Sequence, residues 1–128
     1  MLSDDITGLL RFLPERENSP FEKGEFHPEH GSYDYPKRLR AFRNACHDFC
    51  AHFSFDWVSE IKEIQKWNIE EATLLQLGRL LYAILRQDRF VENNFYVFVI
   101  SEESLSFLRR LKQVATPKAI DEIQNQTE

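Results

Sequence analysis

The chain has 128 residues and a mass of 15.2 kDa, with 42% hydrophobic and 29% charged residues. This length and composition predict one globular domain and exclude a collagen-like, low-complexity or wholly disordered chain. The net charge of -5 argues against a nucleic-acid-binding protein, because such proteins depend on basic side chains that contact phosphates.

The sequence also predicts a compartment. It contains no apolar run close to the roughly 18 residues that a membrane-spanning helix requires, so we expect no membrane association. Residues 1–5 show neither the basic nor the apolar region that is typical of a secretory signal. Two cysteines, Cys46 and Cys50, do not make a disulfide framework, and the sequence therefore predicts a protein of the reducing cytoplasm.

The N-terminal third predicts a helix followed by a long loop. Ser3 is a good N-cap for a helix over residues 3–13, which we expect Pro14 to end. Residues 14–35 contain further prolines and glycines with aromatic side chains between them. We expect an aromatic-rich loop there, which either wraps the body of the domain or forms part of a binding surface.

Two helices are predicted next. Pro36 suits the first position of an amphipathic helix over residues 36–53, whose apolar stripe includes both cysteines. A second helix is expected to extend as far as Trp67, with Ser54 or Asp56 as its N-cap.

Residues 69–86 form the most apolar predicted helix, and we expect it at the centre of the fold. Gly78 lowers the stability of this helix, which indicates that a neighbouring element approaches closely there. Residues 91–100 fit either a strand or a helix, and the lack of a second strand for pairing favours a helix.

Ser101 is the expected cap of a last long helix over residues 102–114. The sequence thus predicts a mainly α-helical, compact bundle of about five to six helices in a single domain over residues 1–114. Residues 115–128 are predicted to be a polar, frayed tail with room for one extra helical turn.

A charged cluster follows the end of the central helix. It contains two arginines and two carboxylates, Arg86, Asp88, Arg89 and Glu92. The acid Asp56 and the aromatic Trp57 could meet them from the preceding helix. One interpretation is a salt-bridge network that joins helix ends. A second is an anion or nucleotide pocket in which the arginines grip phosphate or carboxylate, and a third is a carboxylate pair for acid–base or metal chemistry.

A second constellation combines histidines with cysteines. His27, His30, Cys46 and Cys50 could together supply the ligands of a Cys2His2 zinc site. Both cysteines lie on an apolar helical stripe, however, which favours buried core thiols. A disulfide between two residues four apart on one helix has poor geometry. We therefore predict no metal and no other cofactor.

Five sequence blocks occur in order along residues 9–113. They are Arg11-Phe12-Leu13-Pro14, Phe21-x-x-Gly24-x-Phe26, Phe55-Asp56-Trp57, Leu80 followed by Arg86-x-Asp88-Arg89-Phe90-x-Glu92, and Leu108-Arg109-Arg110-Leu111. With these blocks the chain resembles a bacterial family of domains of unknown function. The resemblance implies a mainly helical domain, favours a helix over residues 91–100 and marks the charged cluster together with Phe90. It implies no activity.

The function predicted from the sequence is a small cytoplasmic interaction or regulatory protein of bacterial, phage or mobile-element origin, with a protein partner or a second copy of itself. The absence of G-x-S-x-G, Walker, H-E-x-x-H and G-x-G-x-x-G motifs favours a non-enzymatic protein. One alternative is a binding protein for a small anion or nucleotide that uses Arg86 and Arg89. A second alternative is a small hydrolase or metal-dependent enzyme.

Overall fold

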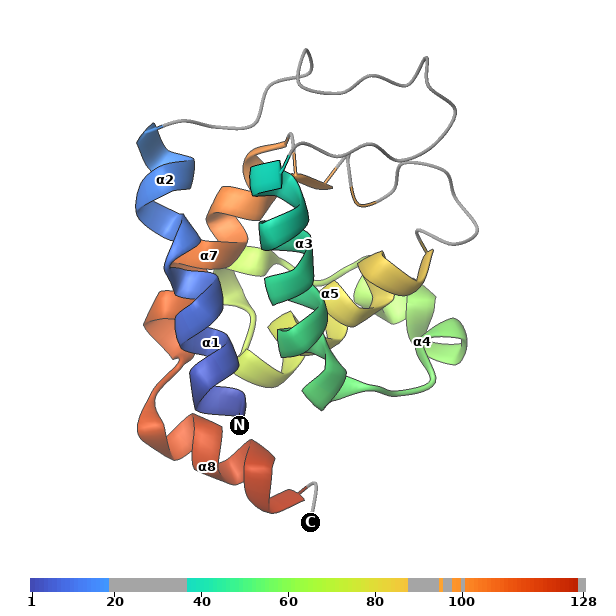
Figure 1. The fold of residues 1–128 in the computed structure, drawn as a ribbon. Coiled ribbons are helices and arrows are strands. Elements are labelled where there is room, and N and C mark those ends of the chain that lie inside the picture. Colours follow the sequence, from blue (N-terminus) through green and yellow to red (C-terminus); the bar gives the residue numbers. More distant parts are fainter. Residues whose placement is uncertain (19–36, 88–94, 96–97, 100, 127–128) are drawn as a thin grey trace.

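The computed structural model describes residues 1–18, 37–87, 95, 98–99 and 101–126. All regular elements within these ranges are helical, which confirms the predicted mainly α-helical bundle (Figure 1). No helix among them combines the length and the apolar character needed to cross a membrane. Most of the loop predicted over residues 14–35 lies outside the described ranges, as does most of residues 88–100.

The N-terminal helix is divided into two. Helix α1 spans Leu2–Leu10 and helix α2 spans Phe12–Asn18. The prediction that Pro14 ends the first helix is wrong, because Pro14 lies in the first turn of α2, where no backbone N–H donor is needed. In an unbroken helix the proline ring would collide with the carbonyl group of Leu10, and α1 ends at that residue.

The start of α1 also differs from the prediction. Ser3, expected as the N-cap, lies within the helix, and Met1 occupies the N-cap position without a side-chain cap. Leu2 is fully buried, so its packing favours a helix that begins one residue earlier. Asp4 and Asp5 lie in the first turn, where negative charge stabilises the positive end of the helix dipole.

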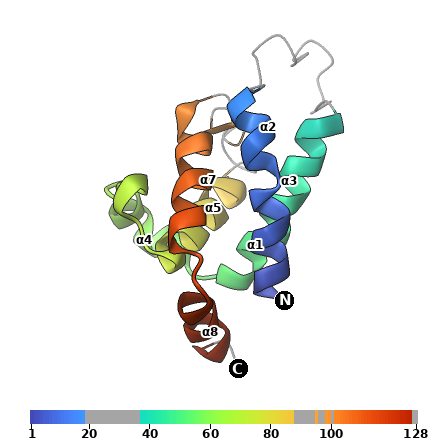
Figure 2. The ribbon, with the colours of Figure 1, turned by 90° about the vertical axis from the view of Figure 1, so that its left-hand side faces the viewer.

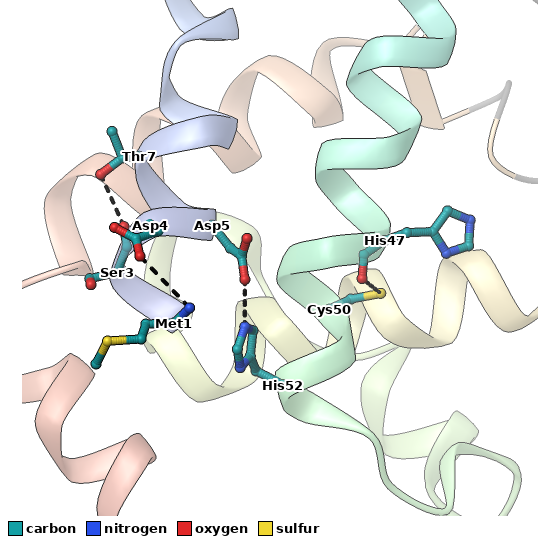
Figure 3. Close-up of polar contacts among 8 residues, drawn as sticks. All are labelled: Met1, Ser3, Asp4, Asp5, Thr7, His47, Cys50 and His52. Atoms are coloured by element: carbon teal, nitrogen blue, oxygen red, sulfur yellow. Dashed lines mark hydrogen bonds and ion pairs between the residues drawn. The ribbon is translucent and has the colours of Figure 1, made fainter.

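Helix α3 spans Lys37–Cys50 and continues into a 3-10 turn, η3, at Ala51–Phe53. The apolar stripe predicted for this segment is confirmed, because all of its members are buried: Leu39, Phe42, Cys46, Phe49, Cys50 and Phe53. Beyond the stripe, His52 Nε2 lies 2.6 Å from Asp5 Oδ2 and joins η3 to α1 (Figure 3).

Helix α4 spans Trp57–Ile64 and lies at the edge of the bundle, where it packs against α5 (Figure 2). It is shorter than predicted, because the chain leaves the helix in a turn before Trp67. Asp56 occupies the N-cap position, but its side chain makes no capping hydrogen bond. Instead, its carbonyl oxygen accepts a hydrogen bond of 3.1 Å from the Ser59 hydroxyl.

The central helix begins later than predicted. A 3-10 turn, η4, covers Ile69–Glu71, and helix α5 covers Leu74–Gln87. The backbone N–H of Gln76 donates to Thr73 Oγ1 at 3.2 Å, and the N–H of Thr73 donates to Gln76 Oε1 at 2.9 Å. This reciprocal pair is a capping box, which fixes the start of α5 just after Thr73.

The described residues of the ambiguous segment, Phe95, Phe98 and Val99, are helical and buried. They agree with the helical prediction for residues 91–100. Helix α7 spans Glu102–Val114, and the hydroxyl of Ser101 accepts a hydrogen bond from the N–H of Glu103 at 3.3 Å. The predicted cap of the last long helix is therefore confirmed.

A further helix, α8, spans Pro117–Gln126, where the sequence predicted a frayed polar tail with room for one extra helical turn. Ile123 is buried in the hydrophobic core, with Ala119 and Ile120 half-buried against it. This apolar contact stabilises a helix that would be marginal alone in water.

The core lies among α1, α3, α5 and α7. Helix α1 packs on α3 and α7, and α5 packs on the same two helices. The largest fully buried aromatic side chains of the described residues come from α3, from α7 and from the segment before α7: Phe42, Phe49, Phe95 and Phe107.

A charged side chain, that of Arg16, is also buried there. Arg16 of α2 is 4% exposed, and its Nη2 donates to the carbonyl oxygen of Val99 and to Ser104 Oγ, both at 2.6 Å. Its guanidinium also stacks on Phe42, with Cζ 5.9 Å from the ring centre. Arg16 therefore links α2 to the start of α7, a role that nothing in the sequence pattern indicated.

Candidate functional site

A small cavity of about 120 Å³ lies between the end of α3 and the last turns of α5. Its lining residues are His47, Cys50, Ala51, Tyr82, Leu85 and Arg86. Tyr82, Leu85 and Arg86 are three and four residues apart, so one face of α5 carries them all. Figure 3 shows His47 extending from α3 toward α5, while its carbonyl oxygen accepts a 3.6 Å hydrogen bond from the Cys50 thiol.

Arg86 is the charged residue among the described residues that line this cavity. Its guanidinium carbon lies 5.0 Å from the centre of the Tyr82 ring, one turn earlier in α5, and its side chain is half-buried. Tyr82 in turn contacts Phe55, with 5.6 Å between ring centres. The arginine is thus held by a cation–π contact whose aromatic partner is itself packed.

The cysteines are core residues. Cys46 and Cys50 are free thiols and both are buried. Burial raises the pKa of Cys50 to about 11, although the positive charge of Arg86 partly opposes this shift. Burial also raises the pKa of Cys46 well above its usual value, and the neighbouring Cys50 adds to the shift. Both thiols therefore remain protonated at neutral pH, whereas the thiolate is the form that binds metal or attacks a substrate.

The other predicted site residues are distributed differently. Asp56 is exposed and Trp57 is half-buried at the start of α4, and neither lines the cavity of Arg86. The remaining candidates lie outside the described residues: His27, His30, Asp88, Arg89 and Glu92. Within the described ranges, no three His, Cys, Asp or Glu side chains are grouped so that they could hold a metal ion.

A second concave region was not anticipated from the sequence. It begins as a hollow of about 270 Å³ between α4 and α5, which extends to η4 and the start of α7. The apolar side chains that line it are Ile61, Ile64, Trp67, Ile69, Leu80, Ala83 and Ile84. Gln65, Gln87 and Glu103 complete its wall.

This hollow continues into two others. The next, of about 310 Å³, shares Trp67, Ile69 and Glu103 with it. The third, also of about 310 Å³, shares Glu70 and Ser106 with the second and extends along the outer face of α7. The three hollows are adjacent, because each shares lining residues with the next, and together they are here called the α4–α7 groove.

The character of the α4–α7 groove changes along its length. Its end between α4 and α5 is mainly apolar, and its middle carries three carboxylates, Glu70, Glu102 and Glu103. Its far end carries Arg109 and Arg110. The sequence showed that the apolar stripe of α5 is wide. It did not show that the neighbouring helices leave part of this stripe uncovered.

Residues 1–116 match the protein family described as a family of unknown function, DUF6508. The chain belongs to this family. No curated protein and no solved structure matches the DUF6508 chain.

The closing Leu-Arg-Arg-Leu block of this DUF6508 protein has a structural explanation. Leu108 and Leu111 are fully buried on the inner face of α7. On the other face, Arg109 Nε lies 3.5 Å from Glu17 Oε1 of α2. Arg110 Nε donates to the carbonyl oxygen of Ala72 at 2.9 Å, which holds the chain just before α5 against α7. The block thus joins α7 to its neighbours by apolar and polar contacts.

Proposed function

We propose that this DUF6508 protein is a small non-enzymatic interaction module whose α4–α7 groove docks an amphipathic segment of a protein partner. The observation that carries this proposal is that a mainly apolar hollow lies directly beside one that carries three carboxylates. Apolar grooves of this kind accept the apolar face of a helical or extended segment, and the polar rim selects among partners.

The charges of the groove indicate the chemistry of the partner. Glu70, Glu102 and Glu103 lie together and within the described residues none of them makes a hydrogen bond or ion pair to a basic side chain. A partner segment with apolar residues followed by lysine or arginine would complement both parts of the groove. The net charge of -5 favours the same basic partner.

The setting of this interaction is part of the proposal. Two free thiols in the core suit a reducing compartment, so we place the protein in the cytoplasm. The resemblance to a bacterial family supports a bacterial, phage or mobile-element origin. Regulation of the partner by docking requires no catalytic group of this chain.

The test compares two substitutions on the same helix. Ile61 lines the groove, whereas Val58, one turn earlier on α4, is 63% exposed and does not line it. Affinity capture from the native cells uses the wild-type chain, Ile61→Glu and Val58→Glu, and each captured protein is then purified and titrated. We expect one partner that binds wild type and Val58→Glu equally and Ile61→Glu at least tenfold more weakly.

Two results would contradict the proposal. One is a partner that binds all three chains with the same affinity, which would place its binding surface elsewhere. The other is the absence of any partner together with sedimentation that shows dimers lost on Ile61→Glu, which would assign the groove to self-association. Circular dichroism of both variants checks that the helical content is unchanged.

A further inference from the structure

The guanidinium of Arg86 lies in the wall of a cavity and has no polar partner among the described residues. Its contact with Tyr82 is a cation–π contact, and within the described part of the chain it makes no hydrogen bond or ion pair. Arginine remains charged at all relevant pH values and has five N–H donors. The buried nitrogen and oxygen atoms without a partner among the described residues do not include those of Arg86, so its guanidinium still reaches solvent and its donors are available to a ligand.

Another arginine of the same helix shows that stacking is not the distinguishing feature. Arg79 is also half-buried, and its Cζ lies 5.2 Å from the centre of the Phe55 ring. It lines none of the cavities described above. Arg86 therefore differs from Arg79 by the concave space beside its charge, not by its aromatic contact.

The position of Arg86 near the end of α5 offers a simpler explanation, because positive charge stabilises the C-terminal end of a helix dipole. This effect requires no cavity and no aromatic platform. The side chain also lies back over Tyr82, four residues toward the N-terminus, and donates to none of the last carbonyl groups of the helix. The helix dipole thus explains a positive charge near the end of α5, but it does not explain why the guanidinium lies over Tyr82 beside a cavity.

The cavity is suited to a tetrahedral anion. Its volume of about 120 Å³ exceeds what a single water needs, and none of the described residues that line it is a carboxylate. The Tyr82 hydroxyl and the His47 imidazole belong to side chains of the same wall, while Leu85 and Ala51 make part of it apolar. A planar guanidinium binds two oxygens of an anion at once. Further donors on other sides of the cavity suit a tetrahedral phosphate, which has more oxygens to offer than a planar carboxylate.

We propose that the cavity between α3 and α5 binds the phosphate group of a small molecule, with Arg86 as the principal ligand and Tyr82 and His47 beside it. The site and the α4–α7 groove have no described lining residue in common, so this proposal is independent of the function proposed above. The phosphate can be inorganic phosphate or the phosphate of a larger metabolite, and both present the same oxygens to Arg86.

The test is an NMR titration of the full chain with sodium phosphate, against sodium chloride at matched ionic strength. A second titration uses a simple phosphomonoester, phenyl phosphate. We expect chemical-shift changes centred on His47, Cys50 and Tyr82. Tighter binding of the phosphomonoester would indicate a metabolite ligand, and equal binding would indicate inorganic phosphate.

Three variants make the test specific. Arg86→Gln should abolish the chemical-shift changes. Arg86→Lys should weaken binding about tenfold, because an ammonium group keeps the positive charge but cannot donate two parallel hydrogen bonds to the phosphate. Arg79→Gln is the matched control on the same helix and should bind phosphate as wild type does. Equal binding by Arg86→Gln and wild type, shifts spread over the surface, or no shifts in the folded wild-type chain would each overturn the proposal.

Discussion

Helix α5 has two sides with different packing. On the side toward α3 and η3, Leu77 and Leu81 are fully buried. Gly78 lies so close to the Phe53 ring that a Cβ atom at this position would overlap it. On the side toward α4, Leu80 and Ile84 are only half-buried and line the α4–α7 groove. One helix thus combines a closely packed side with an incompletely covered one.

This difference separates stability from binding. Close packing leaves no space for a ligand, and any change of volume there is opposed by many neighbouring atoms. Half-buried apolar residues contribute less to the free energy of unfolding and remain available to a partner. We therefore expect substitutions on the α3 side to act on folding and substitutions on the α4 side to act on docking.

Two adjacent leucines give the largest contrast. Leu81→Ala should lower the free energy of unfolding by about 3 to 4 kcal/mol, since it removes a fully buried side chain and leaves a cavity. Leu80→Ala should cost about 1 kcal/mol, because Leu80 is only half-buried and lines the groove. Urea denaturation of both variants measures the difference. Equal losses would mean that both sides of α5 are packed alike.

Two glycines test the close approach itself. Gly78→Ala should lower the free energy of unfolding by about 2 to 3 kcal/mol, because the overlap with Phe53 outweighs the better helix propensity of alanine. Gly8→Ala in α1 is the control, since nothing lies within 4 Å of the added Cβ atom. It should be neutral or raise stability by up to about 1 kcal/mol. A stabilised Gly78→Ala variant would contradict the close contact.

The smallest expected effect on stability concerns Cys50, which lines the cavity of Arg86. The pKa of the Cys50 thiol is about 11 in the folded chain and 9.0 is its usual value. Below pH 9 the thiol is protonated in both states, and between these values only the unfolded chain releases the proton. This difference should lower the free energy of unfolding by about 2 kcal/mol as the pH rises from 9 to 11.

The control for this pH dependence is Cys50→Ala. Denaturation at a series of alkaline pH values should show a shallower loss of stability for the variant than for wild type, whatever its stability at neutral pH. Lysine and tyrosine side chains titrate equally in both chains, so they cancel in the difference. Identical slopes would show that the thiol ionises equally in the folded and unfolded states.

Local patterns in the sequence determined much of the fold. The stripe from Leu39 to Phe53 and the cap at Ser101 both follow from side-chain spacing or from one residue type. Such features depend on neighbours within about one helical turn, and the helical period is the same in every fold. The mainly α-helical class was predictable for this reason.

Tertiary structure decided the features that join distant residues. Arg16 is buried because Val99 and Ser104, more than eighty positions away, supply its acceptors. Helix α8 forms where Ile123 meets the core, although its sequence predicted a frayed tail.

The candidate sites divide in the same way. The charge of Arg86 was evident in the sequence, but the cavity beside it exists only because α3 brings His47 and Cys50 opposite α5. The α4–α7 groove likewise depends on how far α4 lies from the bundle. A sequence determines which face of a helix is apolar, whereas the packing of other helices determines how much of that face is covered.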